Sequence, residues 1–152
     1  MNKAEFYQDL QAQVSALIAG EQDVIANMAN ISALLFDALE LVNWVGFYRV
    51  LDEQLVLGPF QGKVACIRIP LGKGVCGTAA ETGTTQRIAD VHQFSGHIAC
   101  DAMSNAELVV PVMVDGKVIA VLDIDSISFD RFDEQDQQGI ETIVKHLEAC
   151  MV

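Results

Sequence analysis

The stretch ELVVPVMVDGKVIAVLDIDS, residues 107–126, carries the clearest structural signal in the sequence. Two apolar runs rich in β-branched residues flank Asp115-Gly116, a dipeptide that favours a two-residue turn between antiparallel strands. We therefore predict a β-hairpin with strands over 107–114 and 117–126. Because Pro111 lacks a backbone N–H, the first of these strands must lie at a sheet edge or contain a bulge.

The chain before the hairpin changes from helical to strand-like patterns. In the first forty residues, apolar side chains recur at helical spacing in two segments separated by Gly20, the second starting near Asp23 and ending before Asn43. The following segments are short, rich in β-branched and aromatic residues, and bounded by turn residues. They predict an antiparallel meander over 43–51, 53–62 and 64–70.

The segments on either side of the hairpin complete the prediction. Residues 72–83 suit a short helix entered through a glycine turn, with Cys76 in its first turn, and 86–90 suit a short strand. Residues 91–105 have no consistent period and predict a long loop, a feature that is often functional in a compact domain. Acidic residues followed by apolar residues at helical spacing predict a closing helix over 132–152.

These elements indicate one α+β domain over residues 1–152. We expect a central, mainly antiparallel sheet, with the N-terminal helices and the C-terminal helix packed on it and the functional loops on the opposite side. The apolar content of 51% is enough for a well-buried core.

The composition excludes some classes of binding partner and indicates a cellular compartment. The formal net charge of −12 disfavours nucleic acid and anionic membrane surfaces, both of which would be repelled. No stretch approaches the roughly 20 apolar residues of a membrane span, and the N-terminus lacks the order of a signal peptide, so we expect a cytoplasmic protein. In that compartment the four cysteines would stay reduced, and any disulfide would be transient and catalytic.

Three acidic residues are predicted to converge at one end of the hairpin. Strand alternation puts Asp123 and Asp125 on one face, and the partner strand begins at Glu107. Converging carboxylates commonly hold a proton or a cation, so a metal ion, an ammonium group or an acid catalyst would each fit. Solvated residues at strand ends are the alternative interpretation.

Three cysteines lie in segments where a thiolate could be stabilised or a metal held. Cys100 lies in the long loop, three residues after His97, Cys76 lies near a helix start, and Cys66 lies on a predicted strand. Each could equally be a small buried side chain. His97 with the three thiols supplies zinc-ligand types, although the chain has no Cys-x-x-Cys pair.

Trp44 and Tyr48, four residues apart on one predicted strand, share a face. They could form one wall of an apolar pocket suited to a thioether or methyl group. Packing in the core is the alternative.

Three motifs together resemble the free methionine-(R)-sulfoxide reductases, a family of single-domain enzymes with the GAF fold. The motifs are GPFQGKVACIRIPLGKGVCGTAAETG at 58–83, DVHQFSGHIACDAMSNAELVVPV at 90–112 and GKVIAVLDIDS at 116–126. The ordered spacing of the three cysteines, the glutamate and the Asp-x-Asp pair is much more specific than a GAF pattern alone. Most GAF domains are sensors without these thiols.

The resemblance implies roles for the cysteines. Cys100 matches the catalytic cysteine of the family, and Cys66 and Cys76 match its recycling cysteines, with Cys66 favoured as the main partner. Cys150 matches nothing in the family pattern. The resemblance also implies thioredoxin as the external reductant, with no metal or organic cofactor.

The resemblance to this family further implies a substrate pocket for free L-methionine-(R)-sulfoxide. Glu107 and Asp125 would polarise the sulfoxide oxygen, and Asp123 would hold the substrate ammonium group. Trp44 and Tyr48 match the aromatic residues of the family's pocket. Such an enzyme serves in oxidative stress, and similar GAF proteins often form homodimers through their helices.

Two other classes of protein remain compatible with the residues. One is a GAF module that senses a small molecule and uses its cysteines for packing or redox sensing. The other is a regulatory domain that binds zinc through Cys66, Cys76, His97 and Cys100.

Overall fold

The structure is a computed structural model that describes residues 1–96 and 103–151. His97 and Cys100 therefore lie outside the described residues. The elements, in chain order, are α1 (Lys3–Ile18), α2 (Val24–Ala38), β1 (Val42–Leu51), β2 (Gln54–Gly62), β3 (Arg68–Pro70), α3 (Gly74–Thr82), β4 (Gln86–Ile88), the 3-10 helix η1 (Val91–Gln93), β5 (Ala106–Val114), β6 (Lys117–Ser126) and α4 (Glu134–Ala149).

The strands form one six-stranded sheet in the order β3-β2-β1-β6-β5-β4, and every neighbouring pair is antiparallel. The predicted hairpin is confirmed as β5 and β6. Both turn residues have positive φ, 53° at Asp115 and 76° at Gly116, as a tight turn between twisted strands requires. Strand β4 pairs with residues 107–109 of β5, so Pro111 lies beyond it at a local sheet edge, as predicted, and the register of β5 with β6 shifts between Val112 and Met113.

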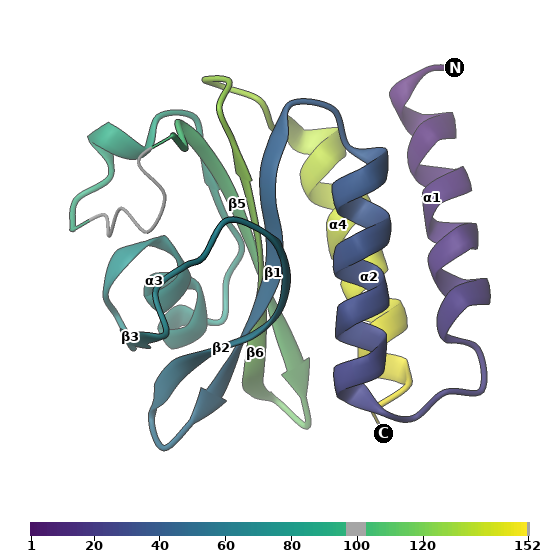
Figure 1. The fold of residues 1–152 in the computed structure, drawn as a ribbon, viewed down its shortest axis with the longest axis horizontal. Helices are drawn as coiled ribbons and strands as arrows, with labels where there is room; N and C mark the ends of the chain where they lie inside the picture. Colours follow the sequence, from purple (N-terminus) through teal and green to yellow (C-terminus); the bar gives the residue numbers. More distant parts are fainter. Residues whose placement is uncertain (97–102, 152) are drawn as a thin grey trace.

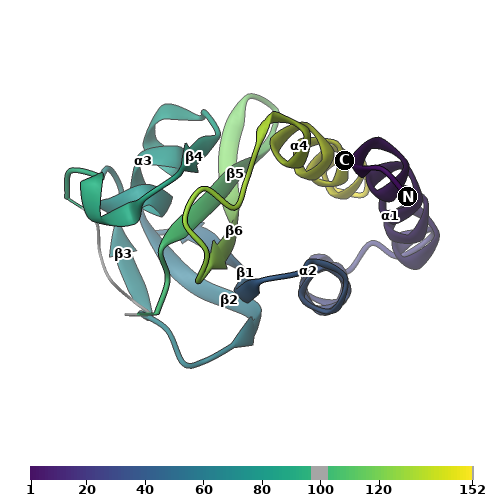
Figure 2. The ribbon, with the colours of Figure 1, turned by 90° about the horizontal axis from the view of Figure 1, so that it is seen from above.

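The sheet separates two layers. Figures 1 and 2 show α1, α2 and α4 on one side of the sheet and α3 on the other. Because side chains alternate along β1 and β6, every second side chain of these strands points into the helical layer. There the apolar residues of the strands and of the helices are buried together. This larger core includes Leu10, Ile31, Phe47, Leu122, Ile124 and Ile140. The predicted α+β class and the opposite placement of the functional segments are confirmed.

One local prediction is wrong. The strand expected over 64–70 begins only at Arg68, so Cys66 lies in an irregular segment before β3. The reason is that the carbonyl groups of Lys63 and Cys66 accept hydrogen bonds from side chains of β1. The loop predicted over 91–105 begins with the short η1, which is capped by the Asp90 side chain accepting from the His92 N–H, and its other described residues, 94–96 and 103–105, lie in no helix or strand.

Helix α1 packs mainly against α4, at the edge of the helical layer (Figure 2). The buried Asp136 of α4 joins the two helices, because it accepts from Tyr7 Oη at 2.7 Å and from Lys3 Nζ at 2.9 Å. Asp136 also closes a capping box with Asp133 at the start of α4. The hydrogen bond from Lys3, followed by the hydrogen bonds with Asp136 and the charge of Lys3, lowers the pKa of Asp133 to about 2.

No helix in the described part of the chain is both long enough and apolar enough to cross a membrane.

The contact between α1 and α4 leaves no space for a side chain at Gly139. A Cβ atom there would overlap the ring of Tyr7. In an exposed helix Gly→Ala stabilises by about 1 kcal/mol, but here we expect Gly139→Ala to destabilise by about 1–3 kcal/mol through overpacking. Thermal unfolding would measure the effect, with the exposed Gln138→Ala as the control expected to stay near wild type. An unchanged or higher Tm for Gly139→Ala would contradict the packing described.

Candidate active site

The three predicted carboxylates do converge. Glu107 on β5 lies directly opposite Asp125 on β6, and Asp123 lies two residues along β6 on the same face. All three are buried, with relative exposures of 7%, 8% and 6%. The interpretation as solvated strand-end residues is therefore wrong. Like charges directly opposite each other destabilise a sheet. The arrangement therefore does not serve stability, and it indicates a functional site.

Burial changes the acidity of the cluster. Desolvation raises the pKa of Glu107 well above its ordinary value, and the negative charge of Asp123 adds to the effect. Desolvation also raises the pKa of Asp123, with the charge of Asp125 as the next cause. A proton is thus retained in the cluster under conditions in which exposed carboxyl groups are ionised. The arrangement can supply a hydrogen-bond donor as well as acceptors.

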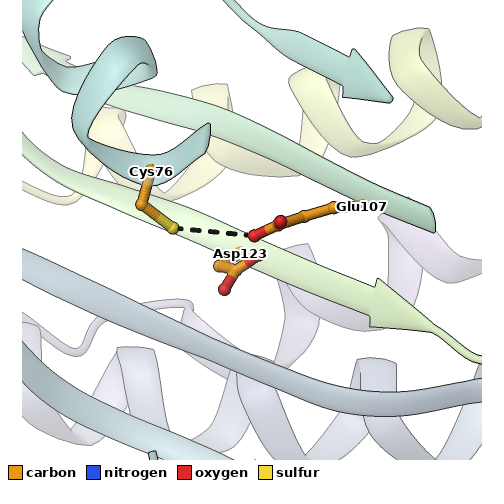
Figure 3. Close-up of side chains that lie close together, drawn as sticks. All are labelled: Cys76, Glu107 and Asp123. Carbon is orange, nitrogen blue, oxygen red and sulfur yellow. Dashed lines mark hydrogen bonds between the residues drawn. The ribbon is translucent and has the colours of Figure 1, made fainter. Parts of the chain in front are cut away.

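Cys76 faces the carboxylates from α3 (Figure 3). It lies in the first turn of that helix, as predicted, and is buried. Its Sγ donates to Glu107 Oε2 at a distance of 3.8 Å. Desolvation, followed by the charges of Asp123 and Glu107, raises the pKa of the Cys76 thiol well above its ordinary value. The group is therefore a neutral thiol, although it lies in the first turn of a helix.

Aromatic side chains form one wall of the pocket. Trp44 stacks on Tyr48 with ring centroids 5.9 Å apart and on Phe60 at 5.2 Å. A side chain at Gly46 would overlap Phe60 and Trp44, so the glycine permits the stack. Both predicted aromatic residues line the pocket, and both are also buried in the smaller core beside α3, so the two interpretations hold together. The contribution of Phe60 was missed, although an aromatic residue in the adjacent strand is a visible signal.

The aromatic wall also positions Cys66. Tyr48 Oη donates to the Cys66 carbonyl at 2.9 Å, and Trp44 Nε1 donates to the Lys63 carbonyl at 3.0 Å. These bonds fix the irregular segment before β3 at the rim of the pocket. Cys66 is disulfide-bonded in this structure, whereas Cys76 and Cys150 are free thiols.

The pocket is a small cavity of about 40 Å³. Lys73, at the start of α3, is the one cationic side chain among its described lining residues, and its role was not predicted. The described lining residues are Trp44, Tyr48, Val64, Ala65, Ile69, Lys73, Gly74, Val75, Cys76, Ser104, Glu107, Asp123 and Asp125.

Other candidate residues lie elsewhere. His92 is exposed, and its Nε2 lies 3.1 Å from Asn105 Oδ1, away from the pocket lining. Cys150 ends α4, with its Sγ 3.9 Å from the Ile18 carbonyl, so it belongs to the helical layer. Within the described residues, the ligand atoms that could hold a metal ion together come from Cys76, Glu107 and Asp123. This set differs from the zinc ligands proposed from sequence.

Comparisons with known proteins agree on one family. A family model described as GAF domain matches residues 26–151. The free methionine-R-sulfoxide reductase of Escherichia coli (strain K12) is 57% identical over 151 residues, which cover 99% of this chain and 92% of that protein. This chain belongs to the GAF-domain family of free methionine-(R)-sulfoxide reductases.

Solved structures of this reductase family share the fold throughout. The free methionine-R-sulfoxide reductase of Neisseria meningitidis in complex with its substrate superposes with a TM-score of 0.96 at 43% identity, covering 99% of this chain and 91% of that one. The fRMsr of Staphylococcus aureus in complex with substrate superposes with a TM-score of 0.93 at 53% identity, covering 96% and 95%. The prediction of a GAF domain and of its family is confirmed.

We expect the buried acidic cluster to lower the free energy of unfolding, and to lower it more as the pH rises. Because the pKa of Asp123 is raised, the folded state binds a proton at pH values at which the unfolded chain releases it. The stabilisation from this bound proton is fully present below about pH 4, the ordinary pKa of an aspartate, and is lost as the pH rises through the raised pKa. We expect Asp123→Asn to raise the free energy of unfolding by about 1 kcal/mol at pH 8 and by less at pH 5.

Thermal unfolding at both pH values measures this difference, and 1 kcal/mol corresponds to about 2–4 °C in a chain of this size. Asp115→Asn is the matched control, because it removes the same charge from the exposed turn of the same hairpin. An equal shift for both variants would show that only net charge matters.

Proposed function

We propose that this protein reduces free L-methionine-(R)-sulfoxide to L-methionine. The observation that carries the proposal is the buried cluster of Glu107, Asp123 and Asp125 facing the Trp44–Tyr48 wall. Full-length similarity to proteins named for this activity, two of them in complex with substrate, supports the assignment.

Each part of the substrate has a matching group. The aromatic wall suits the thioether end of the substrate, and Asp123 suits its ammonium group, because Asp123 Oδ1 is buried without a hydrogen-bond partner among the described residues. Lys73 and the N-terminus of α3 suit the substrate carboxylate. Methionine sulfoxide within a protein has neither free end, so a pocket that binds both selects the free amino acid.

The first chemical step uses Cys100 and a protonated carboxyl group. The Cys100 thiolate attacks the sulfoxide sulfur, while Glu107, assisted by Asp125, donates a proton to the sulfoxide oxygen. The oxygen passes to Cys100 as a sulfenic acid, and methionine is released. The raised pKa of Glu107 supports this role, because an acid catalyst must keep its proton near neutral pH.

The second step resets the thiol. Cys66 attacks the Cys100 sulfenic acid, which forms a disulfide and releases water. Two observations favour Cys66 over Cys76 as the recycling cysteine: Cys66 is disulfide-bonded, and the Cys76 thiol is buried with a raised pKa, which disfavours the nucleophilic thiolate. The disulfide then takes two electrons and two protons from an external dithiol.

Thioredoxin is the dithiol that we propose, because its potential is more reducing than those of other common cellular dithiol carriers. Thiols alone balance the reaction, so turnover needs no metal or organic cofactor. A reducing compartment such as the cytoplasm would sustain the cycle. Pairing of two chains through the helical layer stays a prediction, and exposed Leu17, Ile25 and Phe36 on that layer are compatible with it.

The first test is NADPH oxidation in a thioredoxin-coupled assay with free L-methionine-(R)-sulfoxide. We expect stoichiometric methionine formation by wild type and a loss of at least about a thousandfold in Cys100→Ser, because the nucleophile is removed. Cys150→Ser is the matched control and should keep full activity.

Absence of turnover in wild type would replace the proposal with a ligand-sensing GAF module. Equal activity on the S epimer or on peptide-bound methionine sulfoxide would contradict the proposed substrate.

A second test separates the two candidate recycling cysteines. We expect Cys66→Ser to release about one equivalent of methionine per chain in a rapid burst and then to stop with thioredoxin, because the sulfenic acid has no internal partner. Cys76→Ser should continue through many turnovers. Quenched-flow measurement of methionine gives both amplitudes, and continued turnover of Cys66→Ser with a single burst from Cys76→Ser would reverse the assignment.

A further inference from the structure

Cys76, Glu107 and Asp123 form a ligand set with the geometry of a metal site (Figure 3). One sulfur and two carboxylate oxygens lie within 4.8 Å of one another, and all three residues are buried. The distance from Cys76 Sγ to Glu107 Oε2 is 3.8 Å. Zinc bonds to sulfur and oxygen at tetrahedral angles place these two atoms about 3.5 Å apart, so a small side-chain adjustment is enough.

A second observation points to a ligand at the same place. Asp123 is 94% buried, since its exposure is 6%, and its Oδ1 has no hydrogen-bond partner in the described structure. Buried carboxylate oxygens normally have a partner, and this one lines the pocket. The cavity of about 40 Å³ is large enough for one ion and one water molecule.

The ligand types select the class of cation. A thiolate with two carboxylates suits a borderline-soft divalent ion such as Zn²⁺ or Cd²⁺, whereas Mg²⁺ and Ca²⁺ prefer oxygen ligands alone. Three protein ligands leave a fourth tetrahedral position for water or for Asp125, which lines the same pocket. An ion of charge +2 would also relieve the repulsion among the carboxylates.

We propose that the pocket binds one zinc-class divalent cation through Cys76 Sγ and the carboxylates of Glu107 and Asp123, and that this cation excludes the substrate. The second part rests on the proposed function, because the cation occupies the groups assigned to the substrate ammonium group and sulfoxide oxygen. The metal-free protein is the active form, and the cation acts as an inhibitor.

The test uses the full chain with Cys66→Ser and Cys100→Ser, so that Cys76 and Cys150 are the remaining thiols. Titration with Cd²⁺, followed by the ultraviolet sulfur-to-cadmium charge-transfer band, should give one ion per chain, and calorimetry with Zn²⁺ should give the same stoichiometry. Adding Cys76→Ser should abolish the band, and adding Cys150→Ser, the matched control, should leave it unchanged. Asp123→Asn, expected to fold stably, should weaken binding at least about tenfold.

A band that persists without Cys76, a band that depends on Cys150, or undiminished affinity in Asp123→Asn would overturn the metal site. Free L-methionine-(R)-sulfoxide should raise the apparent Kd of Zn²⁺ in proportion to its concentration. If the sulfoxide leaves the Kd unchanged while wild type turns over normally, the exclusion of substrate is wrong. If wild type shows no turnover but Cd²⁺ binds as described, the proposed function fails and the metal site stands.

Discussion

The main physical constraint on this protein is the burial of three carboxyl groups in one pocket. Glu107, Asp123 and Asp125 could each be solvated at little cost, but they are less than a tenth exposed. Loss of hydration, followed by the charge of a neighbouring aspartate, raises the pKa of Glu107 and of Asp123 and favours their protonated forms. The repulsion and the lost hydration also oppose folding. Other contacts of β5 and β6, the strands that carry the three residues, must therefore compensate for this loss of stability.

Strand β6 holds its acids through its opposite face. Leu122 and Ile124 alternate with the two aspartates and are fully buried under the helical layer. A slip of one residue in register would put carboxylates into that core and apolar side chains into the pocket. The hydrophobic effect on one face of the sheet therefore fixes the electrostatics on the other. Helix α4 completes the layer, and α1 is attached to it through the hydrogen bond from Tyr7 to Asp136.

The wall of the pocket and the proposed redox centre share residues. Trp44 and Tyr48 present aromatic faces to the pocket, while their polar ends bond the backbone of Lys63 and Cys66. Aromatic side chains with one polar end suit this double use. The shape of the pocket and the position of the disulfide-bonded cysteine are thus linked through two side chains of one strand.

Much of the site could be predicted by alternation and turn chemistry, which are local properties. Asp115-Gly116 fixes the hairpin, the hairpin brings Glu107 beside Asp125, and alternation puts Asp123 on the same face. The sequence by itself thus determined which groups meet. Their behaviour depends on tertiary contacts: burial between α3 and the sheet makes Cys76 a neutral thiol, and side-chain hydrogen bonds from β1 keep Cys66 out of a strand. The reason is that desolvation and long-range hydrogen bonds depend on segments far apart in the chain, which no local pattern records.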